Sequence, residues 1–158
     1  MTPNLSSFLS TIRHAEGTDK YPNPYAVCFA NKFTIKDFSE HPTVIGTWHG
    51  ERLDFLGPAY AGKISTAAGA YQIIAPTWRT CKRLLHLPDF SPASQDAAAI
   101  ELIREHGALD LVNSGQISAA IEACHGVWSS LPGSTSGQPQ AKLSDLVQFY
   151  SVNGGAFA

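Results

Sequence analysis

The sequence predicts an α+β fold in which a small, sheet-bearing lobe and a larger helical lobe flank a cleft. A short amphipathic helix opens the chain and is followed by a turn-rich stretch, about residues 17–64, that contains short β-type runs. After residue 64 the apolar residues recur at helical spacing. This order of elements is typical of two-lobed α+β proteins, and the junction between such lobes is where a cleft forms.

The composition indicates one globular domain spanning residues 1–158. Of the 158 residues, 44% are hydrophobic and 15% are charged, which is enough apolar material for a substantial core. The 11 basic and 13 acidic residues give a formal net charge of -2, which makes no electrostatic case for binding nucleic acid or an anionic membrane. A neutral or mixed-charge substrate fits this balance better.

The first predicted helix carries an acidic residue at a position that should be buried. Leu5, Phe8, Leu9 and Ile12 fall at i, i+3, i+4 and i+7, and Glu16 is the next position of the same stripe. A carboxyl group that loses water there has a raised pKa, which makes it a candidate proton donor near neutral pH. The alternative is a glutamate at a frayed helix end that faces solvent, and this stretch alone does not separate the two.

The middle of the chain is predicted to consist of loops and a small sheet. Prolines recur there, and the two β-type runs are residues 25–29 and 43–48. Trp48 lies in this stretch beside His49, so it is the tryptophan that we expect to line the groove.

The remainder is predicted to be helical. We expect a helix from Pro76 that stops by Pro88, one from Pro92 to a C-cap at Gly107, and three more at residues 108–112, 116–127 and 141–150. The first of these has a predicted buried stripe made of Trp78, Cys81, Leu84 and Leu85, and Trp128 is also expected in the core.

A segment of small residues, 67–70, precedes Tyr71 and Gln72. Gly69 permits a backbone conformation that other residues resist, and small residues let the chain approach another group closely. An aromatic face beside an amide suits sugars, which present C–H surfaces and hydroxyl or acetamido groups. Composition alone fits an ordinary loop-to-helix junction with a core tyrosine better.

Several ordered motifs resemble one known family. Residues 15–18, Ala-Glu-Gly-Thr, resemble the Ser-Glu-Gly-Thr of the lambda-type phage endolysins, and residues 65–78 look like their Ser-Thr-Gly-Ala-Gly-x-Tyr-Gln segment. The second segment is also similar to the Gly-Leu-Met-Gln-Ile-x-Pro-x-Thr-Trp run of soluble lytic transglycosylases. Residues 89–97, 105–109 and 124–133 match further endolysin motifs in the same order, so the resemblance covers nearly the whole chain.

This resemblance implies a lysozyme-like enzyme that cleaves peptidoglycan between N-acetylmuramic acid and N-acetylglucosamine. The implied reaction is that of a lytic transglycosylase, in which the muramic acid's own C6 hydroxyl attacks C1 and leaves a 1,6-anhydro end. Glu16 matches the family's catalytic glutamate and would protonate the leaving oxygen, without a metal or organic cofactor. Ser65, Tyr71, Gln72 and Trp48 are the expected substrate contacts.

Hydrolysis by a muramidase is the main alternative, because retaining and inverting glycosidases usually need two carboxylates. The turn-rich stretch supplies five candidates for a second carboxylate: Asp19, Asp37, Glu40, Glu51 and Asp54. An intramolecular hydroxyl nucleophile would remove this need, because the bound substrate supplies its own effective concentration.

A metalloenzyme is a further alternative, with zinc held by His14, His41, His49 or His125. No two of these histidines have the H-x-x-x-H or H-E-x-x-H spacing of a helical zinc site.

Two last alternatives are a cysteine peptidase and a glycan-binding module without catalysis. Cys28 with His41 or His49 could form a nucleophile and base, but Cys28 lies in an apolar run, where we expect a buried and inert thiol. The odd number of widely spaced cysteines indicates reduced thiols rather than disulfides. A binding module would keep the aromatic and amide groups but would not need an acid at position 16.

The N-terminal residues lack a basic segment followed by a long apolar run, and no apolar stretch could cross a bilayer. We therefore expect accumulation in the host cytoplasm without membrane insertion, and action in the periplasm and cell wall after release. The resemblance implies a monomer that acts on the glycan strand, with a holin as a functional partner that it does not bind.

Overall fold

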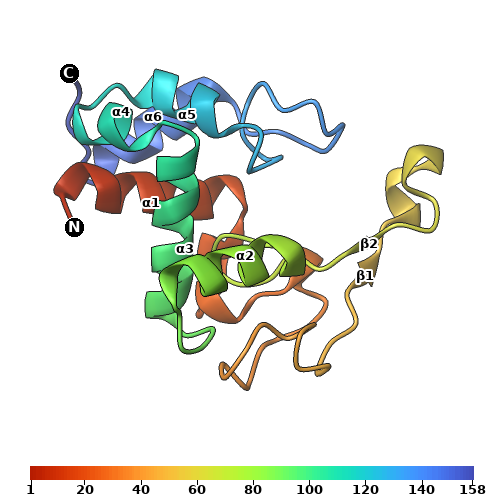
Figure 1. Cartoon of the computed structure of the whole chain (residues 1–158). Helices are drawn as coiled ribbons and strands as arrows, with labels where there is room; N and C mark the ends of the chain where they lie inside the picture. The colour runs from red at the N-terminus through yellow and green to blue at the C-terminus, as the bar shows by residue number, and fades with distance from the viewer. The chain divides into compact units, whose positions relative to one another are not determined.

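The computed structural model describes all 158 residues and contains six α-helices and one small sheet. The helices are α1 (Pro3–Ala15), α2 (Ala75–Leu85), α3 (Pro92–Glu105), α4 (Leu109–Asn113), α5 (Ile117–Cys124) and α6 (Leu143–Val152) (Figure 1). Each predicted helix is therefore confirmed, with ends that differ by a few residues. None of the six combines the length and apolarity that crossing a bilayer requires.

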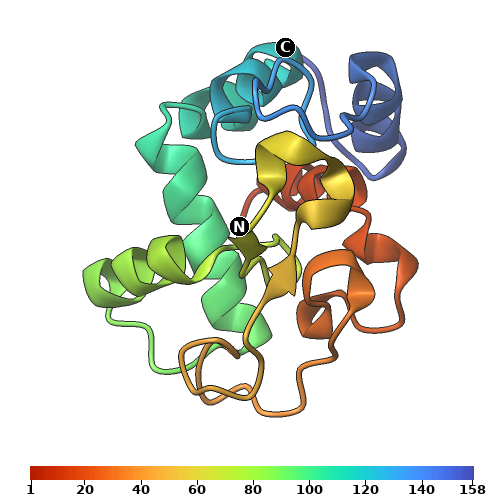
Figure 2. The same cartoon turned by 90° about the vertical axis from the view of Figure 1, so that its right-hand side faces the viewer.

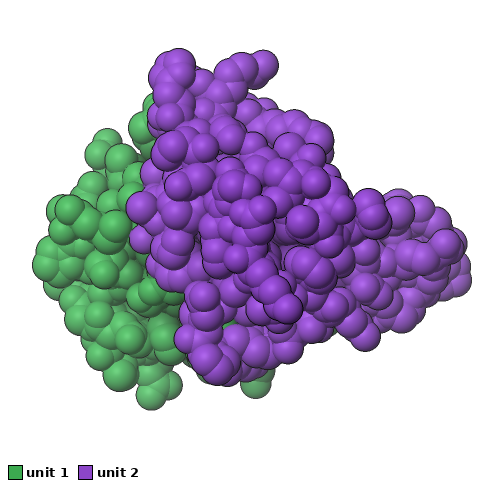
Figure 3. Space-filling model, turned by 90° about the horizontal axis from the view of Figure 1, so that it is seen from below, with its two compact units in different colours: residues 1–19, 99–158 green, residues 20–98 purple.

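The chain divides into two compact units, coloured separately in Figure 3. Unit 1 comprises Met1–Asp19 and Ala99–Ala158, and unit 2 comprises Lys20–Ala98. Unit 2 is larger than the turn-rich stretch predicted at residues 17–64, because it also includes α2 and the first part of α3.

Unit 1 is built around α1, which packs against α4 and α6. Thr2 caps the helix by accepting a hydrogen bond from the Leu5 amide, and Pro3 occupies the first turn, where its missing N–H costs nothing. The predicted apolar stripe is buried, and Phe8 and Ile12 are completely inaccessible to solvent. Full burial of side chains of this size contributes about 1.5–3 kcal/mol each. This packing fixes the end of α1 that carries Glu16.

The core of unit 2 is assembled around Phe90. The ring of Trp78 from α2 meets Phe90 edge-on at 4.7 Å between centroids, and the His41 ring does the same at 5.0 Å. The Trp78 indole N–H donates to the Glu40 carboxylate, which also pairs with Lys82. These contacts explain why α2 belongs to the same unit as the turn-rich stretch.

The exposed side of α2 departs from the sequence-based expectation. Trp78 and Cys81 are buried as predicted, but Leu84 is 54% exposed. The helix ends at the next residue, Leu85, and its C-cap, His86, adopts a left-handed conformation with φ of 53°. Leu84 therefore lies in a last turn with little packed against it, and its predicted place in the buried stripe is wrong.

The predicted strand at residues 43–48 is wrong, and the one at residues 25–29 is reduced to single antiparallel bridges at Val27 and Cys28. The first run begins with a 3-10 helix, η2 (Pro24–Ala26), because Pro24 occupies its first turn and the Asn23 side chain accepts the Tyr25 amide. In the second run the amides of Val44 and Ile45 both donate to the His41 carbonyl, which forms turns instead of a ladder. The other short 3-10 helices near these runs are η1 (Thr18–Lys20) and η3 (Phe29–Asn31).

The sheet is a short antiparallel hairpin further along the chain. Strand β1 (Glu51–Arg52) pairs with β2 (Ile64–Ser65), and Glu51 lies opposite Ser65. Between them the chain forms two 3-10 helices, η4 (Asp54–Leu56) and η5 (Pro58–Tyr60), which make up the yellow end of the hairpin in Figure 2. A small sheet in this stretch is thus confirmed, in a different place from the one predicted.

Candidate active site

The site begins where α1 ends. Glu16 follows the last helical residue and is its C-cap, and its amide donates to the Ile12 carbonyl at 2.9 Å, which continues the helical pattern. Gly17 then adopts a left-handed conformation with φ of 69°, which stops the helix. Glu16 therefore keeps the direction set by the buried stripe of α1, as the sequence predicts.

Glu16 is partly buried, and its carboxyl group is largely surrounded by protein atoms. Burial raises its pKa from 4.5 to about 7, since the surrounding protein cannot solvate the anion as water does. The Ser130 hydroxyl donates to Glu16 Oε1 at 2.6 Å and opposes this shift by stabilising the anion. Burial has the larger effect, so an appreciable fraction of Glu16 retains its proton at neutral pH.

Ser130 is held in place by its neighbours. Trp128 and Leu131 on either side are 2% and 0% exposed, which anchors this short stretch after α5. The Ala141 amide donates to the Ser130 carbonyl at 2.8 Å and ties the far end of the following loop to the same point. The hydroxyl is thus positioned to orient one oxygen of Glu16, Oε1.

The turn that follows Glu16 is also fixed. Thr18 is buried and donates to the Arg13 carbonyl at 3.3 Å. His14 Nδ1 lies 2.7 Å from Asp19 Oδ2, and the His14 ring stacks on Phe149 of α6 at 4.0 Å between centroids. The acid consequently projects from a rigid helix end and not from a mobile loop, as proton transfer to a bound substrate requires.

The Tyr71 segment of unit 2 is organised by buried polar contacts. Tyr71 is completely buried, and its hydroxyl donates to Asp96 Oδ1 at 2.6 Å. The prediction that Tyr71 offers a face to a sugar is therefore wrong in this structure, because its ring packs within the core. Gly69 has a φ of 78°, and a Cβ there would lie 2.1 Å from Gln95 Oε1, so the expected close approach is real.

Trp48 also differs from its expected role. Only 8% of it is exposed, and its ring stacks on Phe33 at 6.2 Å with an interplanar angle of 12°. The groove-lining role predicted for Trp48 is wrong in this structure, because Phe33 and the surrounding turns cover it. Trp78 and Trp128 lie in the core as predicted.

The two remaining predicted contacts, Gln72 and Ser65, each have a polar side-chain atom that could still bind a ligand. The Gln72 side-chain N–H group donates to the Val27 and Gly69 carbonyls, which orients the amide and leaves its oxygen without a bond from the protein. Ser65, in β2, accepts a hydrogen bond from the Ala67 amide and is partly exposed. Their binding of substrate stays a prediction.

The carboxylates considered as partners for Glu16 mostly have other contacts. Asp19 pairs with His14, Asp37 accepts the Ser39 amide, Glu40 pairs with Lys82, and Asp54 pairs with Arg52. Glu51 lies in β1 and is partly exposed. Four of the five candidates therefore have structural partners of their own.

The three thiols and His41 lie inside the fold. Cys28 is buried, and burial raises its pKa to about 12, so it stays protonated and does not act as a nucleophile. Cys81 and Cys124 are likewise free and buried. His41 is completely buried, and its Nε2 lies 3.1 Å from the Ile73 carbonyl oxygen.

The chain is similar to known proteins over almost its whole length. A family model described as endolysin matches residues 6–157. The chain belongs to the endolysin family. It is 38% identical to the endolysin of Escherichia phage P2 over 160 residues, which cover 96% of this chain and 93% of that protein. It is 35% identical to the endolysin of Escherichia phage lambda over 154 residues, which cover 94% and 90%.

This endolysin also matches solved structures over its full length. Bacteriophage lambda lysozyme complexed with a chitohexasaccharide has a TM-score of 0.84 and 31% identity, with 100% of this chain and 98% of that chain covered. A second structure of lysozyme from bacteriophage lambda has a TM-score of 0.83 with the same identity and coverage. The predicted lysozyme-like α+β fold is confirmed, and this endolysin is a lysozyme-like enzyme that degrades peptidoglycan.

Sequence reasoning missed two contacts of this endolysin. It did not pair Ser130 with Glu16, which are 114 residues apart, although residues 124–133 were noted as an endolysin motif. It also did not foresee that Asp96 holds both Tyr25 and Tyr71 through one oxygen. The only indication of this contact in the sequence is that Asp96 lies in the endolysin motif at residues 89–97.

Proposed function

We propose that this endolysin is a lytic transglycosylase that cleaves the β-1,4 bond between N-acetylmuramic acid and N-acetylglucosamine. The observation that supports it best is the desolvated carboxyl of Glu16, whose pKa of about 7 suits a group that gives and then takes a proton. Ser130 orients that carboxyl, and the rigid end of α1 holds it.

The proposed reaction uses Glu16 twice. The protonated carboxyl gives its proton to the glycosidic oxygen as the bond from that oxygen to C1 breaks. The resulting carboxylate then takes the proton from the C6 hydroxyl of the same muramic acid as that oxygen bonds to C1. The ring closes, no water is consumed, and Glu16 returns to its protonated form.

One carboxyl group is sufficient for this sequence of steps. The nucleophile is part of the bound sugar, so the enzyme does not need a second carboxylate to activate water. The structural partners of Asp19, Asp37, Glu40 and Asp54 favour this mechanism over the hydrolytic alternative. A glycan substrate is further supported by the oligosaccharide in the lambda lysozyme structure, because chitohexasaccharide is also a β-1,4-linked chain.

Mass spectrometry of the digested peptidoglycan tests the mechanism. A transglycosylase leaves anhydro ends that are about 18 Da lighter than reducing ends, because no water enters the broken bond. Digestion in ¹⁸O-labelled water should therefore give products without the label. Reducing ends that carry ¹⁸O would instead identify a hydrolytic muramidase and reject the transglycosylase.

We also propose that the enzyme accumulates in the host cytoplasm and reaches the cell wall only after a holin has permeabilised the membrane. Membership of the endolysin family supports this route. Expression in the host with and without a holin gene tests it, since lysis should require the holin. Rapid lysis without the holin would show that the enzyme crosses the membrane by another path.

We further propose that it acts as a monomer, which light scattering at working concentration would check.

A further inference from the structure

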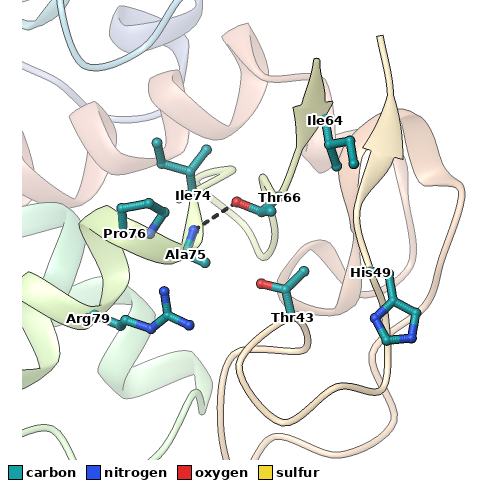
Figure 4. A pocket seen from close by; sticks show the side chains of 8 residues that line it. All are labelled: Thr43, His49, Ile64, Thr66, Ile74, Ala75, Pro76 and Arg79. Atoms are coloured by element: carbon teal, nitrogen blue, oxygen red, sulfur yellow. Dashed lines mark hydrogen bonds between the residues drawn. The ribbon is translucent and has the colours of Figure 1, made fainter. Parts of the chain in front are cut away.

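A pocket lies entirely within unit 2, in a different part of the chain from Glu16 and Ser130. Its volume is about 460 Å³. Three segments line it: the turns of residues 43–49, β2 with the residues after it, and the first turns of α2 (Figure 4). None of its lining residues takes part in the chemistry proposed for Glu16.

The pocket contains an uncommitted cation. Arg79 is exposed on α2 and forms no hydrogen bond or salt bridge, whereas Lys82 on the same helix pairs with Glu40. Figure 4 shows Arg79 extending from α2 towards the space that it shares with Thr43. A guanidinium offers planar, paired donors that match the two oxygens of a carboxylate.

The other polar groups favour an anion over a sugar. Thr66 Oγ1 accepts the Ala75 amide, and the Thr43 hydroxyl lies 3.0 Å from His41 Nδ1, so both hydroxyls already have partners. His49, opposite Arg79 in Figure 4, is exposed and has no such partner. The lining includes no tryptophan, tyrosine or phenylalanine on which a sugar could stack.

The walls of the pocket are apolar and exposed. Ile64 is 57% exposed and Ile74 is 43% exposed, and both are among the residues that line the same pocket as Arg79. Side chains of this kind suit methyl groups and short alkyl chains, which gain free energy when they leave water. The pocket thus combines a carboxylate partner with two aliphatic surfaces.

We propose that this pocket binds the stem peptide of peptidoglycan, with a peptide carboxylate on Arg79 and aliphatic peptide side chains against Ile64 and Ile74. The inference rests on the proposed substrate, because stem peptides are attached to its muramic acid residues. These peptides are short, rich in alanine and carry several carboxylates. Binding them gives the enzyme a preference for glycan strands that still carry peptides.

Matched variants on two substrates test this preference. One substrate is peptidoglycan with its stem peptides, and the other is glycan strands from which an amidase has removed them. We expect the unmodified enzyme to have the lower KM on the peptide-bearing substrate. R79Q should lose about fivefold to tenfold of that preference, as expected for a charge-assisted hydrogen bond at a partly exposed site. R83Q, which removes an exposed cation on the same helix outside the pocket, should keep it.

Equal KM values of the unmodified enzyme on the two substrates would overturn the proposal. So would equal losses in R79Q and R83Q, since these would indicate a general effect of positive charge. Calorimetry with a soluble stem tetrapeptide and E16Q should show binding that R79Q in the same background weakens by about fivefold to tenfold. Reducing ends in the mass spectra would reject the transglycosylase but leave these peptide results unaffected, so the two failures are distinguishable.

Discussion

At the scale of single residues, the proposed chemistry depends on a proton that Glu16 retains near neutral pH. Because Gln has the same shape but cannot transfer that proton, Glu16→Gln should abolish lysis while the fold is kept. Loss of a general acid costs about 10²–10⁴-fold in rate. Turbidity of a peptidoglycan suspension measures the activity, and circular dichroism measures the fold.

Glu122→Gln is the matched control for this prediction. Glu122 is an exposed carboxylate on α5, so its replacement should leave the rate within about twofold of the unmodified enzyme. Lysis by Glu16→Gln at the normal rate would show that another residue is the acid.

Ser130 affects the pKa of the same carboxyl group, and the direction in which its removal shifts that pKa can be predicted. The Ser130 hydrogen bond stabilises the Glu16 anion and lowers its pKa, so Ser130→Ala should raise that pKa further above its ordinary value. The proton donor then persists to higher pH, and the alkaline limb of the kcat profile should move upwards. Ser129→Ala is the control, because Ser129 bonds to Gln138 instead. An unchanged or lowered limb in Ser130→Ala would contradict the assigned contact.

The position of Glu16 at the end of α1 could be predicted from the sequence, whereas the surroundings of Tyr71 and Trp48 could not, for a physical reason. The helical stripe of α1 is a local pattern, so it places position 16 on the buried face without knowledge of the rest of the fold. Tyr71 and Trp48 have side chains that suit a sugar and a protein core equally. Only their partners, Asp96 and Phe33, decide between the two, and these are distant in sequence.

At the scale of elements, the end of α1 is set by the left-handed conformation of Gly17. A side chain at this φ of 69° is strained, so Gly17→Ala should lower the free energy of unfolding by about 1–2 kcal/mol. Denaturant unfolding measures the change. Gly126→Ala is the matched control, since a Cβ there meets nothing within 4 Å and its φ is not positive. Equal effects of the two substitutions would show that Gly17 is not required for the cap.

The helices could be predicted and the strands could not. A helix of ten or more residues repeats its pattern several times, as α1 and α3 do, and helix starts such as Ser91-Pro92 add a second signal. β1 and β2 have only two residues each, which is too short for an alternating pattern to appear. The run at residues 43–48 forms turns because the His41 carbonyl accepts the amides of Val44 and Ile45. The run at residues 25–29 begins with a turn that the Asn23 side chain caps, and only Val27 and Cys28 form single bridges.

At the scale of the whole molecule, the family could be predicted from the sequence, but the division into two compact units could not. Ordered motifs along the chain indicated the endolysins because each constrains a different segment, and the family match over residues 6–157 agrees. The extent of unit 2 could not be predicted, because it depends on Trp78 and His41 packing against Phe90. The cleft expected between lobes stays a prediction.

The free energy of unfolding of the whole protein should depend on pH because of Glu16. The pKa of Glu16 is about 7 in the folded state and near 4.5 in the unfolded chain, so the folded state holds the proton more tightly. Below the unfolded value both states are protonated and burial of the group carries no ionic penalty. As the pH rises through the folded value, the anion must be buried, and the free energy of unfolding falls by up to about 3 kcal/mol.

Urea unfolding of the unmodified protein and Glu16→Gln at pH 4 and pH 8 measures this change in the free energy of unfolding. The two should be similar at pH 4, and the variant should be the more stable at pH 8; a difference that does not change with pH would mean that Glu16 is not desolvated.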